Sequence, residues 1–457
     1  MENPVKISST GVTILFSMDA MRTPEIGRTS FGSNFGAKRF WLSRLVPNQK
    51  VAWNVLSPQE GLFKPTFLVN GEVGQEIELI GPQNTVQMKL AEKGWQRATA
   101  PDALKLPKGR SVVEMKIELG TLADFKAVEL VPVAEEQNIA KRIEAMKGDI
   151  SWMSTAGYGI MVQGGGWSFP PHGPKKPWPG FAEDFNAGAF VERVHEMGGS
   201  YIVWSATWAD YLFPAPIQAI AEVMPNRVSK RDLIADLITE CRKRNMKLLL
   251  YYHLGHDQKD VMIAKGWKPT GPQDPESRQK WMDREEKIFT EIGLRYGDGI
   301  AGYFIDDGCC WYPADFEKLG RALKAGNPNR VICYNPWRCC SLTAFQDFYA
   351  GEGFTGESAN MADDKGFATD PKCKGLKVWG CFCFEPGDWG VRKAETVIEP
   401  TKWTVDRVIA MTKNLEKKKF SVAINLLMYE DGSVSENSYS ILKEAARKLK
   451  RGKWSER

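Results

Sequence analysis

A regular alternation of apolar runs and amphipathic segments beyond residue 150 most constrains what this chain can fold into. Strands are expected at residues 159–162, 201–205, 247–252, 302–305, 331–334, 348–350, 378–384 and 421–427, and helices at 185–197, 230–244, 274–296, 314–324 and 405–417. The strands are rich in Val, Ile, Leu and Tyr without polar alternation, which is typical of parallel strands buried on both faces. Eight such strands in about 300 residues predict an α/β fold, a (β/α)8 TIM-like barrel.

A doubly wound open sheet is the alternative fold for this part of the chain. Such folds often bind nucleotides through a Gly-x-Gly-x-x-Gly fingerprint or a phosphate loop after the first strand. The first expected strand is followed by the glycine run 164–166, which lacks the Lys-Ser/Thr pair of a phosphate loop. The barrel is therefore the preferred interpretation.

The first 135 residues have a different character, with short β-rich segments and no convincing helix. Strands are expected at residues 12–17, 51–55, 66–69, 76–79, 85–90, 111–118 and 125–132, with turns such as Asn70-Gly71 between them. This pattern predicts an all-β sandwich over residues 1–135. By analogy it is like a carbohydrate-binding module. Residues 131–143 turn helical in composition and are expected to link the sandwich to a barrel domain over residues 136–457.

Composition excludes several function classes. The net charge is +5, from 61 basic and 56 acidic side chains without a basic stripe, which argues against a nucleic-acid partner. No apolar stretch of about 18 residues is present, so no membrane span is expected. The start Met-Glu-Asn-Pro lacks a basic n-region, so we expect a cytoplasmic protein, or a periplasmic or secreted one if a signal peptide was removed. Nine cysteines, all from Cys241 onward, suggest reduced thiols rather than a disulfide framework.

Polar and aromatic side chains follow the expected strands, at the end of a barrel where enzymes keep their chemistry. Residues 301–308, Ala-Gly-Tyr-Phe-Ile-Asp-Asp-Gly, bring two adjacent carboxylates to the end of a buried strand. Adjacent side chains on a strand face opposite ways, so only one of the pair is expected to enter a cleft directly. The candidate catalytic residues are Asp306, Glu352 and Glu385; the candidate substrate-binding residues are Gln163, Trp167, Trp208, Asp210, His253, His256, Asp307, Trp311, Asn335, Trp337, Glu357 and Trp389.

These residue types suit a sugar. One ionised and one protonated carboxyl group are what a glycoside hydrolase needs. The chain holds 16 tryptophans, and an indole offers an apolar face to a pyranose ring while its hydroxyl groups find polar partners. An oligo- or polysaccharide substrate is therefore expected, with no cofactor and no metal.

Two other chemistries fit the same strand ends. His253-x-x-His256, followed by Asp306 and Asp307 after the next strand, could supply metal ligands for hydrolysis. Cysteines near strand ends, such as Cys309, could act as nucleophiles, although buried cysteines usually serve as small hydrophobic residues.

Five motifs in order then resemble the family 29 α-L-fucosidases over nearly all of residues 150–450. Residues 158–165 read Tyr-Gly-Ile-Met-Val-Gln-Gly-Gly, and residues 197–203 read Met-Gly-Gly-Ser-Tyr-Ile-Val. Residues 230–234 and 247–252 are similar to the family's Arg-Asp-Leu-Val helix and following strand. Residues 304–308 match the nucleophile strand, Trp-x-Asp-x-Gly in that family, and residues 424–434 resemble its final motif.

The resemblance implies a retaining glycosidase with Asp306 as nucleophile. This sequence also departs from the family's motifs at several positions. The family's sugar-binding histidines are replaced here by Gln163, Trp208 and Ala209, and its tryptophan-glutamate dipeptide by Trp379-Gly380. Three functions stay open at this stage. They are a glycosidase acting on fucose or a fucose-like sugar, a non-catalytic carbohydrate-binding relative, and a metal-dependent hydrolase that uses His253 and His256.

Overall fold

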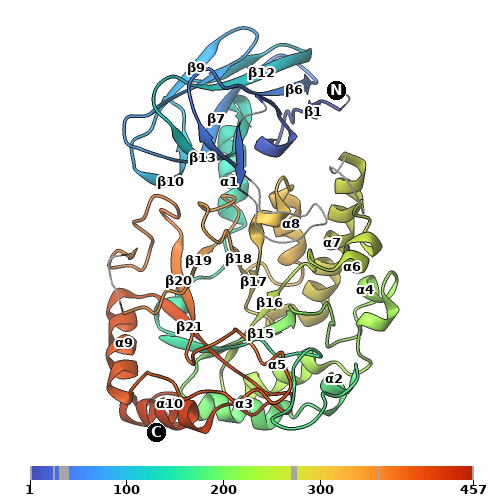
Figure 1. Ribbon diagram of the computed structural model, residues 1–457, viewed down its shortest axis with the longest axis vertical. Coiled ribbons are helices and arrows are strands. Elements are labelled where there is room, and N and C mark those ends of the chain that lie inside the picture. The colour runs from blue at the N-terminus through green and yellow to red at the C-terminus, as the bar shows by residue number, and fades with distance from the viewer. Residues whose placement is uncertain (1–2, 24–25, 30–40, 269–274, 358–360, 455–457) are drawn as a thin grey trace.

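The computed structural model describes residues 3–23, 26–29, 41–268, 275–357 and 361–454. Two β-sheets from the N-terminal part lie at one end of the molecule, and a parallel sheet flanked by helices forms the rest (Figure 1). In the described part of the chain, none of the helices combines the length and apolarity needed to cross a bilayer.

Eight parallel strands form a nearly closed sheet in the order β18-β17-β16-β15-β14-β21-β20-β19. Their bounds are β14 Tyr158–Val162, β15 Tyr201–Thr207, β16 Lys247–Tyr252, β17 Gly302–Ile305, β18 Val331–Tyr334, β19 Phe348–Glu352, β20 Lys377–Cys383 and β21 Ser421–Leu426. All eight expected strands are confirmed, with ends that differ by two residues at most. The mixed α/β class is confirmed as well.

The strands alternate between two packed faces. One cluster of buried side chains, which includes Met161, Tyr251 and Phe304, comes from one face of the sheet, and a second, larger cluster packs the other face against the helices. Trp379 belongs to the first cluster, and its indole N–H donates to the hydroxyl of Tyr201 at 2.9 Å. Both faces are apolar because the sheet is covered on both sides, which explains the continuous hydrophobic runs in the sequence.

The gap in the sheet lies between β18 and β19, which share no backbone ladder. Asp347, just before β19, bridges it. Its N–H donates to the carbonyl of Ile332 at 2.8 Å, and its Oδ2 accepts from the N–H of Ile332 at 2.7 Å and from Lys324 Nζ at 3.2 Å. One residue thus supplies, through its backbone N–H and its carboxylate, hydrogen bonds across the gap.

Helices connect most of the parallel strands. They are α2 Gly180–Asp184, α3 Ala187–Glu196, α4 Gln218–Ala221, α5 Leu233–Lys243, α6 Lys259–Ala264, α7 Pro275–Tyr296, α8 Phe316–Leu323, α9 Val405–Lys418 and α10 Glu436–Leu449. The expected helices are confirmed; the predicted first residue of the helix at 274–296 lies outside the described residues. Between β18 and β19, and in the described residues between β19 and β20, the chain runs without an α-helix.

The N-terminal part forms two sheets, of which one has the order β1-β6-β12-β8-β9 with β3 beside β6. The other runs β10-β7-β13-β5-β4, with β11 beside β7 and β2 beside β13. The bounds are β1 Val5–Lys6, β2 Thr13–Phe16, β3 Met21–Arg22, β4 Gly27–Thr29, β5 Trp41–Leu45, β6 Val51–Ser57, β7 Gly61–Gly71, β8 Glu76–Ile80, β9 Thr85–Lys89, β10 Gly94–Thr99, β11 Leu104–Leu106, β12 Gly109–Ile117 and β13 Leu122–Pro132.

The seven strands expected here are present, but the described residues contain six further strands that were missed. Four of these have only two or three residues, too few for an alternating pattern to show. The expected helix at 131–143 begins too early, because β13 continues to Pro132 and α1 spans Glu136–Ala145.

Candidate functional site

A small cavity of about 40 Å³ lies where the parallel strands end. Its lining residues come from or directly follow seven of the eight strands, and they are Met161, Gln163, Trp208, Tyr251, Phe304, Asp306, Asn335, Glu352, Cys381 and Trp389. Six of these are residues that the sequence nominated. Met161, Tyr251, Phe304 and Cys381 were not nominated as site residues.

Asp306 is the carboxylate held most firmly in this cavity. It leaves β17 two residues beyond Phe304 and therefore continues the same face of the strand. Its Oδ2 accepts from the hydroxyl of Tyr251 at 2.5 Å, and its Oδ1 accepts from Asn335 Nδ2 and from the backbone N–H of Asp307, both at 2.8 Å. Three donors from three neighbouring segments fix the orientation of the carboxylate.

Burial raises the pKa of Asp306, and the negative charge of Asp307 raises it further. The charge of His253 and the hydrogen bonds from Tyr251 and Asn335 act in the opposite direction, since they stabilise the ionised form. The donor Tyr251 keeps its proton, because burial and then the charge of Asp306 raise the pKa of its phenol well above the ordinary value. Asp306 is thus a carboxylate in a partly desolvated, hydrogen-bonded position.

Asn335 connects Asp306 to a second carboxylate. The same Nδ2 that donates to Asp306 lies 3.5 Å from Oε2 of Glu352, the exposed last residue of β19. The nearest oxygens of the two carboxylates can therefore be no farther apart than these two distances together. Asn335 is itself oriented, because its Oδ1 accepts from the N–H of Trp337 at 3.1 Å.

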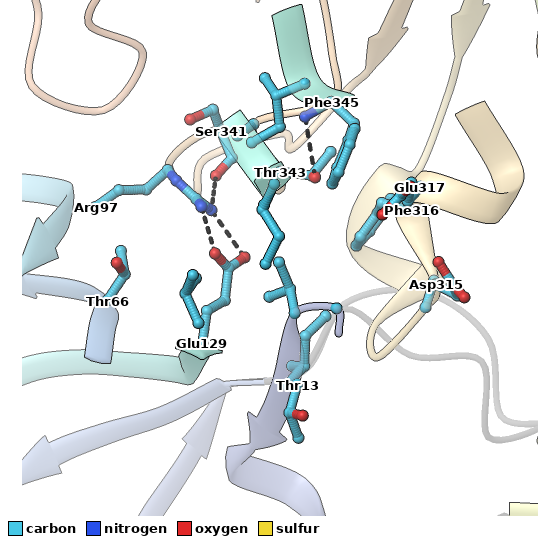
Figure 2. Close-up of a pocket in the computed structure, with 18 of the residues that line it drawn as sticks. Thr13, Thr66, Arg97, Glu129, Asp315, Phe316, Glu317, Ser341, Thr343 and Phe345 are labelled. Atoms are coloured by element: carbon cyan, nitrogen blue, oxygen red, sulfur yellow. Dashed lines mark hydrogen bonds and ion pairs between the residues drawn. The ribbon is translucent and has the colours of Figure 1, made fainter. Parts of the chain in front are cut away.

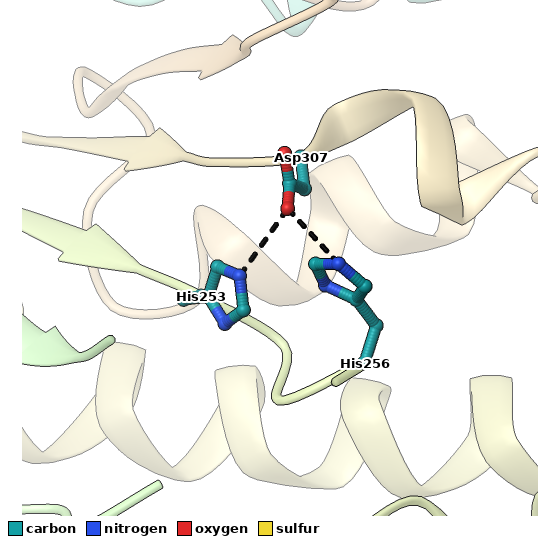
Figure 3. A group of neighbouring side chains, drawn as sticks. All are labelled: His253, His256 and Asp307. Atoms are coloured by element: carbon teal, nitrogen blue, oxygen red, sulfur yellow. Dashed lines mark hydrogen bonds and ion pairs between the residues drawn. The ribbon is translucent and has the colours of Figure 1, made fainter. Parts of the chain in front are cut away.

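Asp307 turns away from the cavity and contacts two histidines of the loop after β16 (Figure 3). Its Oδ2 lies 3.3 Å from His253 Nε2 and 3.1 Å from His256 Nε2, and all three side chains are buried. Burial alone would lower the pKa of His253, but the hydrogen bond and charge of Asp307 outweigh it, so this pKa is raised. Potential ligand atoms of the three residues lie within 4.8 Å of one another.

Gln163 and two tryptophans form the opposite wall. Gln163 is only 2% exposed, and its Oε1 has no hydrogen-bond partner among the described residues. A buried acceptor of this kind requires a donor, which a hydroxyl group of a bound ligand can supply. Trp208 packs edge-on against Trp167 with ring centroids 6.3 Å apart, and the backbone carbonyl of Trp389 accepts from Asn425.

Several nominated residues lie outside the lining of this cavity. Trp311 packs in the core against Trp281 of α7, and Glu357 forms a two-pronged ion pair with Arg407 of α9. The half-buried residues Asp210 and Trp337 likewise lie outside the lining, although Trp337 orients Asn335.

Glu385 is nine-tenths or more buried and accepts from the N–H of Leu427 at 3.2 Å. Burial raises its pKa, and the hydroxyl of Ser438 on α10 lowers it in part. The carboxyl therefore faces a neighbouring strand end and helix and does not line the cavity that holds Asp306.

The missed residue with the clearest role is Tyr251. It is the penultimate residue of β16, and its side chain belongs to the same cluster as Phe304. The expected register of β16 beside β17 could have revealed it, since Tyr251 pairs with Phe304. The residue type alone could not identify it as a site residue, because the adjacent Tyr252 is also a tyrosine and faces the helices.

A much larger cavity, about 1120 Å³, lies elsewhere, between the N-terminal sheets, α1, α8 and the segment before β19 (Figure 2). Arg97 crosses it from β10, pairing with Glu129 and donating to the carbonyls of Ser341 and Leu342 at 3.3 and 3.2 Å. The charged groups of this larger cavity largely pair with one another. Among the described residues, carboxylates from different strand ends converge only in the smaller cavity. We therefore place the chemistry in the smaller cavity.

Comparison with known proteins gives one family match. Residues 175–310 match the family model described as alpha-L-fucosidase. None of the curated proteins matches the chain.

Solved structures are similar at low sequence identity. The endo-fucoidan hydrolase MfFcnA4 from glycoside hydrolase family 107 is 14% identical, with a TM-score of 0.51 over 65% of this chain and 53% of that one. A second such hydrolase, MfFcnA9, is also 14% identical, with a TM-score of 0.50 over 65% and 63%. These likenesses concern the fold alone.

A further similar structure is the alpha-L-fucosidase AlfC from Lactobacillus casei with its product. It is 17% identical, with a TM-score of 0.44, and the match covers 68% of this chain and 98% of that one. The match of residues 175–310 contains the motifs found at residues 197–203, 230–234, 247–252 and 304–308, and it agrees with a divergent resemblance to the α-L-fucosidases.

Proposed function

We propose that the chain is a retaining glycoside hydrolase that acts on fucose or a fucose-like sugar in an oligo- or polysaccharide. Its nearly closed sheet is a (β/α)8 barrel in this proposal, and residues 1–135 are a sandwich domain appended to it. Asp306 is the nucleophile, and Glu352 is the general acid and base. Gln163, Trp208 and Trp389 surround the sugar.

The observation that carries the proposal is the shared contact of Asp306 and Glu352 with one nitrogen of Asn335. Contact distances of 2.8 and 3.5 Å bring oxygens of the two carboxylates close together, which favours a retaining pair over an inverting pair, whose carboxyl groups are roughly 6.5 to 9.5 Å apart. A retaining pair stands at about 5 to 5.5 Å, which leaves no room for a water between the carboxylate and the sugar.

The roles follow from the environments of the two carboxylates. Asp306 is fixed by three hydrogen bonds from the protein, so its position suits attack on the anomeric carbon, which forms a covalent glycosyl-enzyme. Glu352 is exposed at the rim, where it can give a proton to the departing oxygen and later accept one from the incoming water.

The test is hydrolysis of an aryl α-L-fucoside and a panel of other aryl glycosides by wild type, Asp306→Asn and Glu352→Gln. Asp306→Asn should lose about a thousandfold or more of kcat/KM, and wild-type turnover should survive chelator treatment. Glu352→Gln should keep the first step on a substrate with a good leaving group but slow the attack of water. Added azide, which needs no general base, should restore its turnover and yield a glycosyl azide with retained configuration.

Other outcomes would change the assignment. Azide rescue in Glu385→Gln instead of Glu352→Gln would move the acid and base role to Glu385. Sugar binding by calorimetry without turnover of any panel member or of a fucose-containing polysaccharide would indicate a binding protein. Loss of turnover on chelation would indicate metal-dependent hydrolysis.

A further inference from the structure

The cluster of His253, His256 and Asp307 has the composition of a metal site, but its hydrogen bonds do not fit one. A histidine that binds a metal offers a lone pair from one ring nitrogen and usually donates a hydrogen bond from the other. In His253, Nδ1 accepts from the backbone N–H of Gly255 at 3.2 Å. Nδ1 then carries no proton in the neutral ring, so Nε2 carries it and points to Asp307. A protonated Nε2 has no lone pair for a metal.

We propose that His253 and His256 form a hydrogen-bonded clamp on Asp307, and that Asp307 is a positioning residue for the attacking carboxylate of Asp306. The second part rests on the proposed function, in which Asp306 is the nucleophile. The clamp itself does not depend on it.

The backbone at Asp307 shows why a clamp is needed. Asp307 has φ of 50°, in the left-handed region that residues other than glycine seldom occupy. In this conformation its N–H donates to Oδ1 of Asp306 at 2.8 Å. Such a conformation is strained for a residue that has a Cβ atom, and it persists where surrounding contacts determine it. The two histidines, at 3.3 and 3.1 Å from Oδ2, are such contacts.

The loop that carries the histidines is itself anchored from behind. Lys265 donates to the carbonyl of Leu254 at 2.8 Å and pairs with Glu285 of α7 at 2.7 Å, and both charged side chains are fully buried. Glu285 also accepts from the hydroxyl of Tyr252 at 2.7 Å. The clamp is therefore built on a segment with fixed geometry, and its effect passes through Asp307 to Asp306.

The charged and titratable groups around the clamp come from several segments. His253 faces Asp307, and the negative charges of Asp257 and Asp306 also raise its pKa. Asp306 faces Tyr251 of β16, and its charge also acts on the thiols of Cys333 and Cys381. Glu352 acts on Tyr251 from β19.

The clamp can be tested without a substrate, by ¹⁵N NMR of the histidine side chains in the intact protein. The chain has four histidines, and His253→Asn and His256→Asn assign the two in question. We expect the neutral form of His253 to carry its proton on Nε2. In Asp307→Asn its pKa should fall, because burial remains while the carboxylate partner is lost. Asp257→Asn removes the same charge from the same loop and should lower it less.

Three results would overturn the clamp. They are a proton on Nδ1 of His253, an unchanged His253 pKa in Asp307→Asn, and a stoichiometric metal ion in the purified protein that is lost in both histidine variants. If Asp307→Asn does not fold, Asp307→Gly serves instead, because glycine adopts the positive φ without strain and lacks the carboxylate.

The positioning role is tested by turnover of whichever panel glycoside the wild type hydrolyses. Asp307→Asn should lower kcat about ten- to hundredfold with KM nearly unchanged, as for a misplaced reacting group, while Asp257→Asn keeps wild-type values. An unchanged kcat in Asp307→Asn or Asp307→Gly would refute positioning. If the NMR result holds but no glycoside is turned over, the proposed function fails and the clamp stands. If Asp306 is essential for turnover but the NMR measurements contradict the clamp, the proposed function stands and the clamp fails.

Discussion

Among single residues, Tyr251 has the clearest effect on the charge of Asp306. The phenol donates to Oδ2 of Asp306 from the neighbouring strand at 2.5 Å. This hydrogen bond stabilises the ionised carboxylate against the burial and the charge of Asp307, which both raise its pKa. A hydrogen bond to a charged group contributes about 1.5 to 3 kcal/mol.

We therefore expect Tyr251→Phe to lower kcat/KM about ten- to hundredfold, the factor that corresponds to such a bond. The pKa of Asp306 should rise, and since a carboxylate in its proposed role as nucleophile must be ionised, the acid limb of the pH profile should move to higher pH. Tyr303→Phe is the matched control, because Tyr303 lies on β17 with a buried hydroxyl that has no partner among the described residues. A profile of Tyr251→Phe that stays at the wild-type pH would contradict the role of the phenol.

The sequence could place Asp306 but not the hydrogen bonds that hold its carboxylate. Asp306 is the first polar residue after a short apolar run, and a strand end is a local feature of the sequence. Tyr251 and Asn335 reach Asp306 from other strands, so their roles depend on how three strands align. Glu385 was nominated by the same local rule as Glu352, and only the packing against α10 reveals that it lies outside the cavity.

At the scale of elements, the loop between β16 and α6 is held by charges buried beneath it. Lys265 and Glu285 pair at 2.7 Å with no exposed side-chain surface. The burial of Lys265 lowers its pKa, and the carboxylate of Glu285 offsets this in part. Removing one partner of a buried pair leaves the other charge unpaired in the interior.

Lys265→Met should accordingly destabilise the protein by about 3 to 5 kcal/mol, measured by denaturant unfolding. The double variant Lys265→Met with Glu285→Gln should recover part of this loss, because no unpaired charge remains. The comparison pair Lys280→Met and Glu276→Gln lies on the exposed side of α7 and should change stability by about 1 kcal/mol at most. Equal losses in the single and the double variant would show that the pairing is not what matters.

The elements that sequence reasoning predicted well are those with a strong period. Strands such as Gly302–Ile305 and Val331–Tyr334 were expected with their observed ends, because a turn or a helix bounds a purely apolar run. The short strand Leu104–Leu106 carries too few residues for a period. The link between β18 and β19 depends on the side chain of Asp347, whose contact with Ile332 no local sequence pattern predicts.

At the scale of the whole molecule, Arg97 ties the N-terminal sheets to the parallel sheet. Its guanidinium pairs with Glu129 of β13 and donates to two carbonyls of the segment between β18 and β19. Tyr312 adds a contact, since its hydroxyl donates to Oε1 of Glu129 at 3.3 Å. The two parts thus share buried hydrogen bonds as well as an apolar cluster that includes Phe16.

Arg97→Met should weaken this connection and broaden or split the calorimetric unfolding transition, because the two parts then unfold less cooperatively. The midpoint of the less stable part should fall. Lys105→Met is the matched control, since Lys105 also pairs with a glutamate of the N-terminal sheets, Glu60, but on the exposed surface. A single transition of unchanged width in Arg97→Met would mean that the apolar contacts alone couple the two parts.

The missing helix between β18 and β19 also limits how this protein can change over evolution. A binding module joined by a loose linker can be exchanged for another without harm to the enzyme beside it. Here the N-terminal sheets contact the segment that replaces a helix, and Asp347 bridges the strands beneath it. Recombination that replaced the first 135 residues would leave that segment without its cover, so the two parts of the chain are expected to be inherited together.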